Sequence, residues 1–140
     1  MVKNLDVILK LVRNLITIDG PSGVGKGTLA FSLAKSLGWN VLDSGLLYRL
    51  VGYLSLEEKL KSSQEIVLFL NKSKIQLLTN FKEGICEIEL NEKVLGKELR
   101  NENIASRASE LAKEAEIRNA IIKIQRNAYD PEKGLIADGR

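Results

Sequence analysis

Residues 20–28 restrict the fold of this chain more than any other segment. They read Gly-Pro-Ser-Gly-Val-Gly-Lys-Gly-Thr and follow Leu15–Asp19, a short β-branched and apolar run that is typical of a buried strand. After them, apolar residues recur at helical spacing as far as Leu37, and Gly38 is a natural residue just past a helix end. We therefore expect a strand, a glycine-rich loop and a helix in direct succession.

A strand, loop and helix of this composition are typical of a phosphate-binding loop, and a glycine-rich turn without a ligand is the alternative. The glycines let successive backbone N–H groups point toward phosphate oxygens, and the helix adds the positive end of its dipole. Lys26 supplies a mobile positive charge for the β and γ phosphates of a nucleotide. Since the hydroxyl belongs to Thr28 rather than to residue 27, the residue next to Lys26 cannot ligate magnesium directly. The predicted nucleotide-binding residues are Gly20, Pro21, Ser22, Gly23, Val24, Gly25, Lys26, Gly27 and Thr28.

The segment after this first helix predicts one more strand and two helices. Trp39–Leu42 is a short apolar run that is typical of a strand. Either Asp43 or Ser44 is suited to cap a helix that extends through Leu54. A further helix is expected at Gln64–Leu70.

The second half of the chain predicts a hairpin, a long helical region and a third strand. Lys74–Thr79 and Ile85–Leu90 alternate apolar and polar residues around a polar turn, as in an antiparallel hairpin. Cys86, the single cysteine, lies in the second of these runs, and we interpret it as a small hydrophobic residue rather than a nucleophile. Glu102–Ala128 has a helical apolar face, and Leu135–Ala137 predicts a short buried strand.

The composition is ordinary for a single soluble globular domain. The chain has 140 residues, of which 44% are hydrophobic and 28% charged. It contains no histidine, which excludes imidazole chemistry, and its net charge of +3 is too small to predict nucleic-acid binding. Charges interrupt the apolar run of the first residues, and no stretch approaches the roughly 20 apolar residues of a membrane span. We expect a cytoplasmic protein that binds neither nucleic acid nor membranes.

Three separated motifs together resemble bacterial cytidylate kinases. They are Ile18-Asp-Gly-Pro-Ser-Gly23, Leu42-Asp-Ser-Gly-Leu-Leu-Tyr-Arg49 and Leu135-Ile-Ala-Asp-Gly-Arg140. The second motif discriminates, because adenylate kinases typically carry a Thr-Gly-Asp segment there. The resemblance implies an α/β fold: a P-loop NTPase-like parallel sheet with helices on both faces, and an inserted monophosphate-binding region with a small antiparallel sheet. By residue, it implies an extension at 1–14, a partial kinase domain at 15–140 and the insert at 57–100.

The resemblance also implies a reaction, a cofactor and a set of residues. The reaction is ATP-dependent phosphorylation of CMP and dCMP with Mg²⁺, in which small nucleotides are the partners and the parent enzyme is a monomer. Thr28 and Asp138 would contact the metal through water. The catalytic residues would be Lys26, Asp138 and Arg140. The acceptor would be bound by Ser44, Arg49, Arg100, Ser109, Arg118 and Arg140.

Several of these residues have plainer interpretations when the resemblance is set aside. Ser44 is then a helix cap and Arg49 an exposed helix residue, and Asp43 is an equally good cap. Arg100 is equally suited to an exposed salt bridge. Ser109 and Arg118 raise a geometric question, because nine helical positions amount to about 900° of rotation and 13 Å of rise. Both side chains reach one nucleotide only if the helix breaks, and we expect the break near residues 112–114.

Family members continue beyond the Asp-Gly-Arg motif with a lid that carries arginines and with further strands. We therefore expect the C-terminal strands and lid to be absent, and one side of Leu15–Asp19 to be unpaired. An apolar strand with an open edge predicts a chain that is unstable or oligomeric, and loss of lid arginines predicts slow turnover. Two other functions stay open: a nucleotide-binding module without turnover, and a P-loop kinase for another small acceptor.

Overall fold

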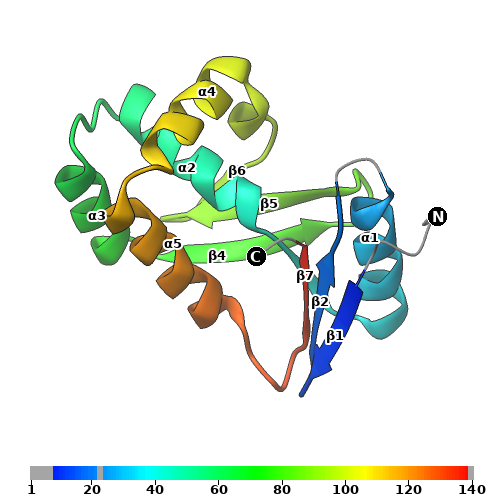
Figure 1. The fold of residues 1–140 in the computed structure, drawn as a ribbon. Coiled ribbons are helices and arrows are strands. Elements are labelled where there is room, and N and C mark those ends of the chain that lie inside the picture. Colours follow the sequence, from blue (N-terminus) through cyan, green and yellow to red (C-terminus); the bar gives the residue numbers. More distant parts are fainter. Residues whose placement is uncertain (1–7, 22–23, 139–140) are drawn as a thin grey trace.

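The computed structural model describes residues 8–21 and 24–138 of the chain (Figure 1). Its larger sheet has four strands in the order β1-β2-β7-β3. β2 (Leu15–Asp19), β7 (Leu135–Asp138) and β3 (Asn40–Asp43) are parallel to one another, with β7 between the other two. This arrangement, with helices around the parallel strands and a separate small antiparallel sheet, confirms the predicted α/β class.

β1 (Ile8–Val12) corrects one expectation, because it pairs antiparallel with β2 along the strand's whole length. The prediction that one side of Leu15–Asp19 is unpaired is therefore wrong. The pairing follows from a tight turn at residues 13 and 14, in which Asn14 adopts a left-handed φ of 52°. The open edge from which we expected instability or oligomerisation is thus covered by the chain itself.

The same turn is tied to the loop that precedes β7. The Asn14 side chain donates to the Pro131 carbonyl, and the Tyr129 hydroxyl donates to the Arg13 carbonyl. The Leu135 N–H donates to the Asn14 carbonyl at 2.9 Å. These bonds join the start of β2 to the start of β7, so the two strands enter the sheet in a defined register.

Apolar burial explains why the parallel strands assemble. Ile18 and Ile136 are fully buried, and Val41 is 2% exposed. Strands of a parallel sheet are buried on both faces, which accounts for their nearly continuous hydrophobic sequences. Gly134, directly before β7, has a φ of +80°, and a Cβ there would lie 2.3 Å from the Trp39 ring. A glycine is therefore required where the starts of β3 and β7 pack together.

The helices form in the order that the sequence predicts, with one break. α1 (Lys26–Leu37) packs on the parallel strands, and α2 (Ser44–Leu56) packs on α4 (Glu102–Leu111). α3 (Ser63–Lys72) packs on α5 (Ala115–Ala128). α4 ends at Leu111 and α5 begins at Ala115, so the predicted break near residues 112–114 is confirmed.

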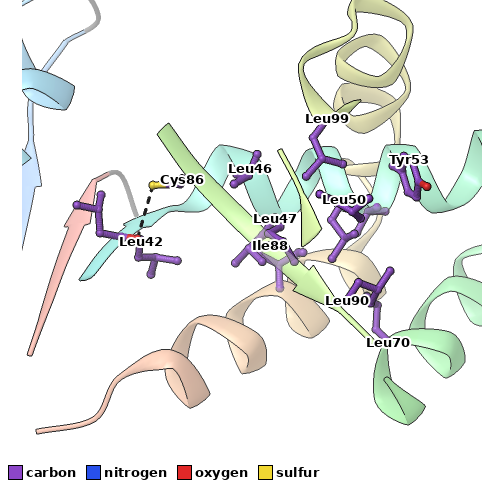
Figure 2. Packing of buried hydrophobic residues seen from close by; sticks show 14 of the residues in the cluster. Leu42, Leu46, Leu47, Leu50, Tyr53, Leu70, Cys86, Ile88, Leu90 and Leu99 are labelled. Carbon is purple, nitrogen blue, oxygen red and sulfur yellow. Dashed lines mark hydrogen bonds between the residues drawn. The ribbon is translucent and has the colours of Figure 1, made fainter. Parts of the chain in front are cut away.

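The small sheet contains the predicted hairpin and one strand that the sequence did not reveal. β4 (Ile75–Asn80) and β5 (Ile85–Leu90) pair antiparallel, and β6 (Lys93–Leu95) adds a third strand beside β5. A short 3-10 turn, Lys97–Arg100, follows. Alternate residues of β5 point into the core, where they meet leucines of α2 (Figure 2). Cys86 is 5% exposed, which confirms its interpretation as a buried hydrophobic residue.

Gly52 allows α2 and α4 to approach closely. A Cβ at this position would lie 2.5 Å from the Ile104 carbonyl oxygen and 3.0 Å from the Ala108 nitrogen. Both neighbours are backbone atoms of α4, so they cannot move aside by a change of side-chain rotamer. The close packing of these two helices therefore depends on the absence of a side chain here.

We predict that Gly52→Ala lowers the free energy of unfolding by about 1–3 kcal/mol, because the added methyl group overpacks the contact between α2 and α4. Gly27→Ala is the matched control: Gly27 is also helical, but a Cβ there meets nothing within 4 Å. That variant should retain or gain stability, since alanine is favoured over glycine in helices by about 1 kcal/mol. Urea unfolding followed by circular dichroism measures both, and equal effects would contradict this account of Gly52.

Candidate functional site

Three aspartates end the three parallel strands at one edge of the sheet. They are Asp19 of β2, Asp138 of β7 and Asp43 of β3. In the observed register, Asp138 is paired with Ile18 on one side and with Asp43 on the other. The carboxyl edge of a parallel sheet is the usual position of ligand sites in such folds. The predicted glycine-rich loop leaves the sheet at this same edge.

The N-terminus of α1 at this edge is suited to bind an anion. Its N-terminal flanking residue, Gly25, has a left-handed φ of 95°, a conformation that favours glycine. In the described part of the chain, no side chain caps this end and no acidic residue lies in the first turn. Gly27 and Thr28 are exposed there. Among the described residues, therefore, no side chain caps the positive end of the helix dipole. Among the predicted loop residues, Ser22 and Gly23 lie outside the described residues, as does Arg140.

Lys26 and Asp138 form an ion pair between α1 and β7. Lys26 Nζ lies 3.8 Å from Asp138 Oδ1, and about a quarter of each side chain is exposed. Burial raises the pKa of the Asp138 carboxyl; the Lys26 ammonium opposes this, and the Asp43 and Asp19 carboxylates reinforce it. The Lys26 ammonium thus offsets part of the cost of burying the Asp138 carboxylate.

The residues at this edge fit a magnesium ion that they contact through water. Among the described residues, no group of three potential ligands is arranged to hold a metal ion. Magnesium, however, often takes one or two carboxylates and completes its shell with water and substrate phosphates. Asp138 ends β7, and Thr28 is exposed in the first turn of α1. These two residues fit contact with magnesium through water rather than a cage of protein ligands.

A cavity of about 390 Å³ brings together three of the predicted acceptor residues. Arg49 comes from α2, Arg100 from the 3-10 turn and Ser109 from α4. A volume in this range suits a small-molecule ligand. The other lining residues were not predicted. They are Asn101, Glu102, Ala105 and Ser106.

A helix signal in the sequence would have located part of this lining. Asn101 caps α4, and its side-chain oxygen accepts from the N–H groups of Asn103 and Ile104. An asparagine followed by a run of helix formers is a recognised start signal. It places the beginning of α4, and with it Glu102 and Ala105, beside Arg100.

Two other predicted acceptor residues, Arg118 and Ser44, do not line this cavity. Arg118 donates to the carbonyls of Ala112 and Lys113 at 3.1 and 2.7 Å, where it satisfies the end of α4. Ser109 lines the cavity, but its hydroxyl donates to the Ala105 carbonyl.

At the start of α2, Asp43 is the cap, and its carboxylate accepts from the Gly45 N–H. Ser44 is therefore the first residue of the helix, not its cap.

A larger cavity, of about 460 Å³, lies far from this chemistry. Its lining includes Asn40 and Leu135, the first residues of β3 and β7, and so it opens at the opposite end of those strands. No predicted site residue lines it. The smaller cavity beside Arg49 is therefore the better candidate for an acceptor site.

Comparison with known proteins decides the family. A family model described as cytidylate kinase matches residues 16–140, which include the phosphate-loop segment, both walls of the arginine-lined cavity and β7. The chain belongs to the cytidylate kinase family. The family resemblance inferred from the three sequence motifs is thereby confirmed.

Individual cytidylate kinases match along most of this chain but not along most of their own length. The protein of Pasteurella multocida (strain Pm70) is 38% identical over 126 residues, which cover 90% of this chain and 55% of that protein. That of Pseudomonas syringae pv. tomato is 40% identical over 134 residues, covering 94% and 58%. The chain thus spans about half the length of the cytidylate kinases it matches. Within residues 8–21 and 24–138, no helix is long and apolar enough to cross a membrane.

We predict that Asp138→Asn raises the free energy of unfolding at pH 7. Because burial raises the pKa of Asp138 in the folded state, ionised Asp138 costs stability at every pH above that raised value. Below the unfolded pKa the carboxyl is neutral in both states and the cost disappears. The stability advantage of the variant should therefore shrink as the pH falls through the acid range.

Urea unfolding of both proteins at a series of pH values measures this difference. A less stable variant at pH 7 would mean that the attraction between Lys26 and Asp138 outweighs the cost of burying the carboxylate, and the prediction would be wrong.

Proposed function

We propose that this chain carries the nucleotide-binding and acceptor-binding parts of an enzyme that phosphorylates CMP and dCMP with ATP. The observation that carries the proposal is that β3 connects the start of α1 with the arginine-lined cavity. The anion-binding end of α1 lies beside Asp138, which is paired with Asp43. From Asp43, α2 leads to Arg49 over six residues, or about 9 Å. A phosphate donor and a phosphate acceptor held at these two places would lie end to end.

The donor half of the site is assigned to the loop and to the start of α1. Backbone N–H groups at Gly25, Lys26, Gly27 and Thr28 would surround the phosphates of ATP, and Lys26 would follow the β and γ phosphates. Its ammonium is already held near the edge by Asp138, at 3.8 Å. Because this ammonium lies beside the start of α1, it would make the main charged contact with a polyanion bound there.

The acceptor half is assigned to the arginine-lined cavity. Arg49 is half-buried on α2, and a planar guanidinium suits bidentate binding of a monophosphate. Arg100 adds a second guanidinium, while Ser109, Ser106 and Asn101 offer groups that hydrogen-bond a base or ribose. Arg118 joins them if its guanidinium exchanges the Ala112 and Lys113 carbonyls for phosphate. Ser44 and Arg140 stay predictions of the same kind.

Transfer of a phosphoryl group requires little covalent chemistry from the protein. The residues of this chain would hold the two oxygens in line and place positive charge around the transferring group. Magnesium, when bound, would supply positive charge that neutralises part of the charge of the phosphates. Asp138 would accept hydrogen bonds from its water. The proposal includes a cytoplasmic location and a monomeric parent enzyme.

An acceptor panel tests this function. We expect the purified chain to form ADP from ATP and Mg²⁺ with CMP and dCMP, and not with UMP, AMP or shikimate. Lys26→Met should lower the rate by about 100-fold or more, because it removes a charge that stabilises the transition state. A coupled assay for ADP gives the rates. If another acceptor is preferred, the assignment to CMP is wrong; nucleotide binding without ADP formation would indicate a binding module.

A second test separates the two halves of the site. Arg49→Gln should raise the KM for CMP about tenfold or more while leaving the KM for ATP nearly unchanged, since a charged hydrogen bond contributes about 1.5–3 kcal/mol. Arg126→Gln is the matched control: Arg126 lies in the last turn of α5, outside the lining of the cavity. A similar rise in both variants would contradict the assignment of Arg49.

A further inference from the structure

Among the described residues, one edge of β3 is not paired with another strand. It pairs with β7 on one side and is the last strand of its sheet. In a parallel pair, the N–H and C=O groups of alternate residues point away from the partner strand. At Val41 both of these groups face the β4–β5 hairpin instead of solvent. Since Val41 is 2% exposed, its backbone groups need partners from the protein.

Two side chains of the hairpin supply those partners. The Val41 N–H donates to Thr79 Oγ1 at 2.8 Å, and the Cys86 thiol donates to the Val41 carbonyl at 3.6 Å. Figure 2 shows the second bond as the dashed line from Cys86. Thr79 and Cys86 lie directly opposite each other on β4 and β5. One cross-strand pair therefore closes the edge of β3 at a single residue.

One member of this pair, Cys86, is also bonded to a residue that lines the acceptor cavity. The backbone carbonyl of Cys86 accepts a hydrogen bond from Arg100 Nη2 at 3.4 Å. Arg100 lines the cavity together with Arg49. Cys86 thus bonds to β3 through its thiol and to an acceptor arginine through its carbonyl group.

The thiol of Cys86 remains a donor in this position. Burial, followed by the charge of Asp43, raises its pKa to about 12. A thiol that keeps its proton can donate to the Val41 carbonyl throughout the physiological range. It is correspondingly unsuited to act as a nucleophile.

β3 carries the other wall of the cavity. Two residues after Val41, Asp43 caps α2, and α2 carries Arg49. A shift of Val41 relative to the hairpin would move the start of α2 relative to Arg100. Arg49 lies on α2, which follows β3, and Arg100 lies on the 3-10 turn. The Thr79 and Cys86 pair is bonded to β3 at Val41 and to Arg100 itself.

We propose that Thr79 and Cys86 are positioning residues that set the separation of Arg49 and Arg100 in the acceptor site. The proposal rests on the proposed function, in which these arginines bind the monophosphate. Neither residue lines the cavity itself, so both act through Val41 and Arg100. A bidentate or paired arginine site loses affinity when its groups are misplaced. The hydrogen bonds of Thr79 and Cys86 described above go to Val41 and Arg100 and not to the donor loop, so we expect the affinity for CMP to change more than the affinity for ATP.

Thr79→Val tests the proposal with little change in side-chain volume. The variant leaves the buried Val41 N–H without an acceptor, whereas Thr79→Ser retains the hydroxyl and is the matched control. We expect Thr79→Val to weaken CMP binding about tenfold, with ATP binding within about twofold of the parent, and Thr79→Ser to restore CMP binding. Calorimetric titration with CMP and ATP measures both affinities. Equal behaviour of the two variants, or a parallel loss of ATP affinity, would overturn the proposal.

A second measurement does not depend on the substrate. In nitrogen–proton spectra, the Val41 amide and the Arg100 guanidinium signals should both shift in Thr79→Val and return in Thr79→Ser. Cys86→Ala, which removes the thiol but keeps the carbonyl, should produce a smaller shift of the same signals and serves if Thr79→Val does not fold. A changed Val41 signal with an unchanged Arg100 signal would refute the linkage. Failure of the parent chain to bind CMP, with the linkage intact, would count against the proposed function alone.

Discussion

The structure depends on the pairing of β7 with β2 and β3. β7 comes from the far end of the described chain, and its insertion between two early strands places Asp138 between Ile18 and Asp43. Only then does Lys26 meet a carboxylate, at 3.8 Å. The burial that drives this pairing also raises the pKa of Asp138, so the interaction that completes the sheet creates the electrostatic character of the site.

The acceptor cavity depends on a different kind of contact, the close packing of α2 on α4. Gly52 provides the space for this packing. Because α4 ends at Leu111, Ser109 and Arg118 do not lie on one continuous helix. Arg118 then satisfies the carbonyls that the break exposes. The guanidinium thus supplies partners that the interrupted backbone lacks.

The small antiparallel sheet joins these two regions. Its hairpin contacts the edge of β3 through Thr79 and Cys86, and its tip contacts α1 through the edge-to-face pair of Phe31 and Phe81, whose ring centroids are 6.2 Å apart. The hairpin therefore contacts both β3 and α1, rather than extending into solvent. Its buried side chains also form much of the common core with α2 (Figure 2).

Much of the fold and part of the site follow from sequence alone, because they rest on local chemistry. The glycines and Lys26 after an apolar strand, the alternation in the hairpin and the family motifs are all short-range patterns. They determined the α/β class, the family and the meeting of Arg49, Arg100 and Ser109. Only the tertiary structure decided the contacts between separate segments. These are the pairing of β1 with β2, the hydrogen bonds of Arg118 to the carbonyls after α4, and the hydrogen bonds of the hairpin to Val41. Backbone groups at such edges carry no sequence signal of their own, since every residue has them, and their partners are chosen by whichever elements the core brings alongside.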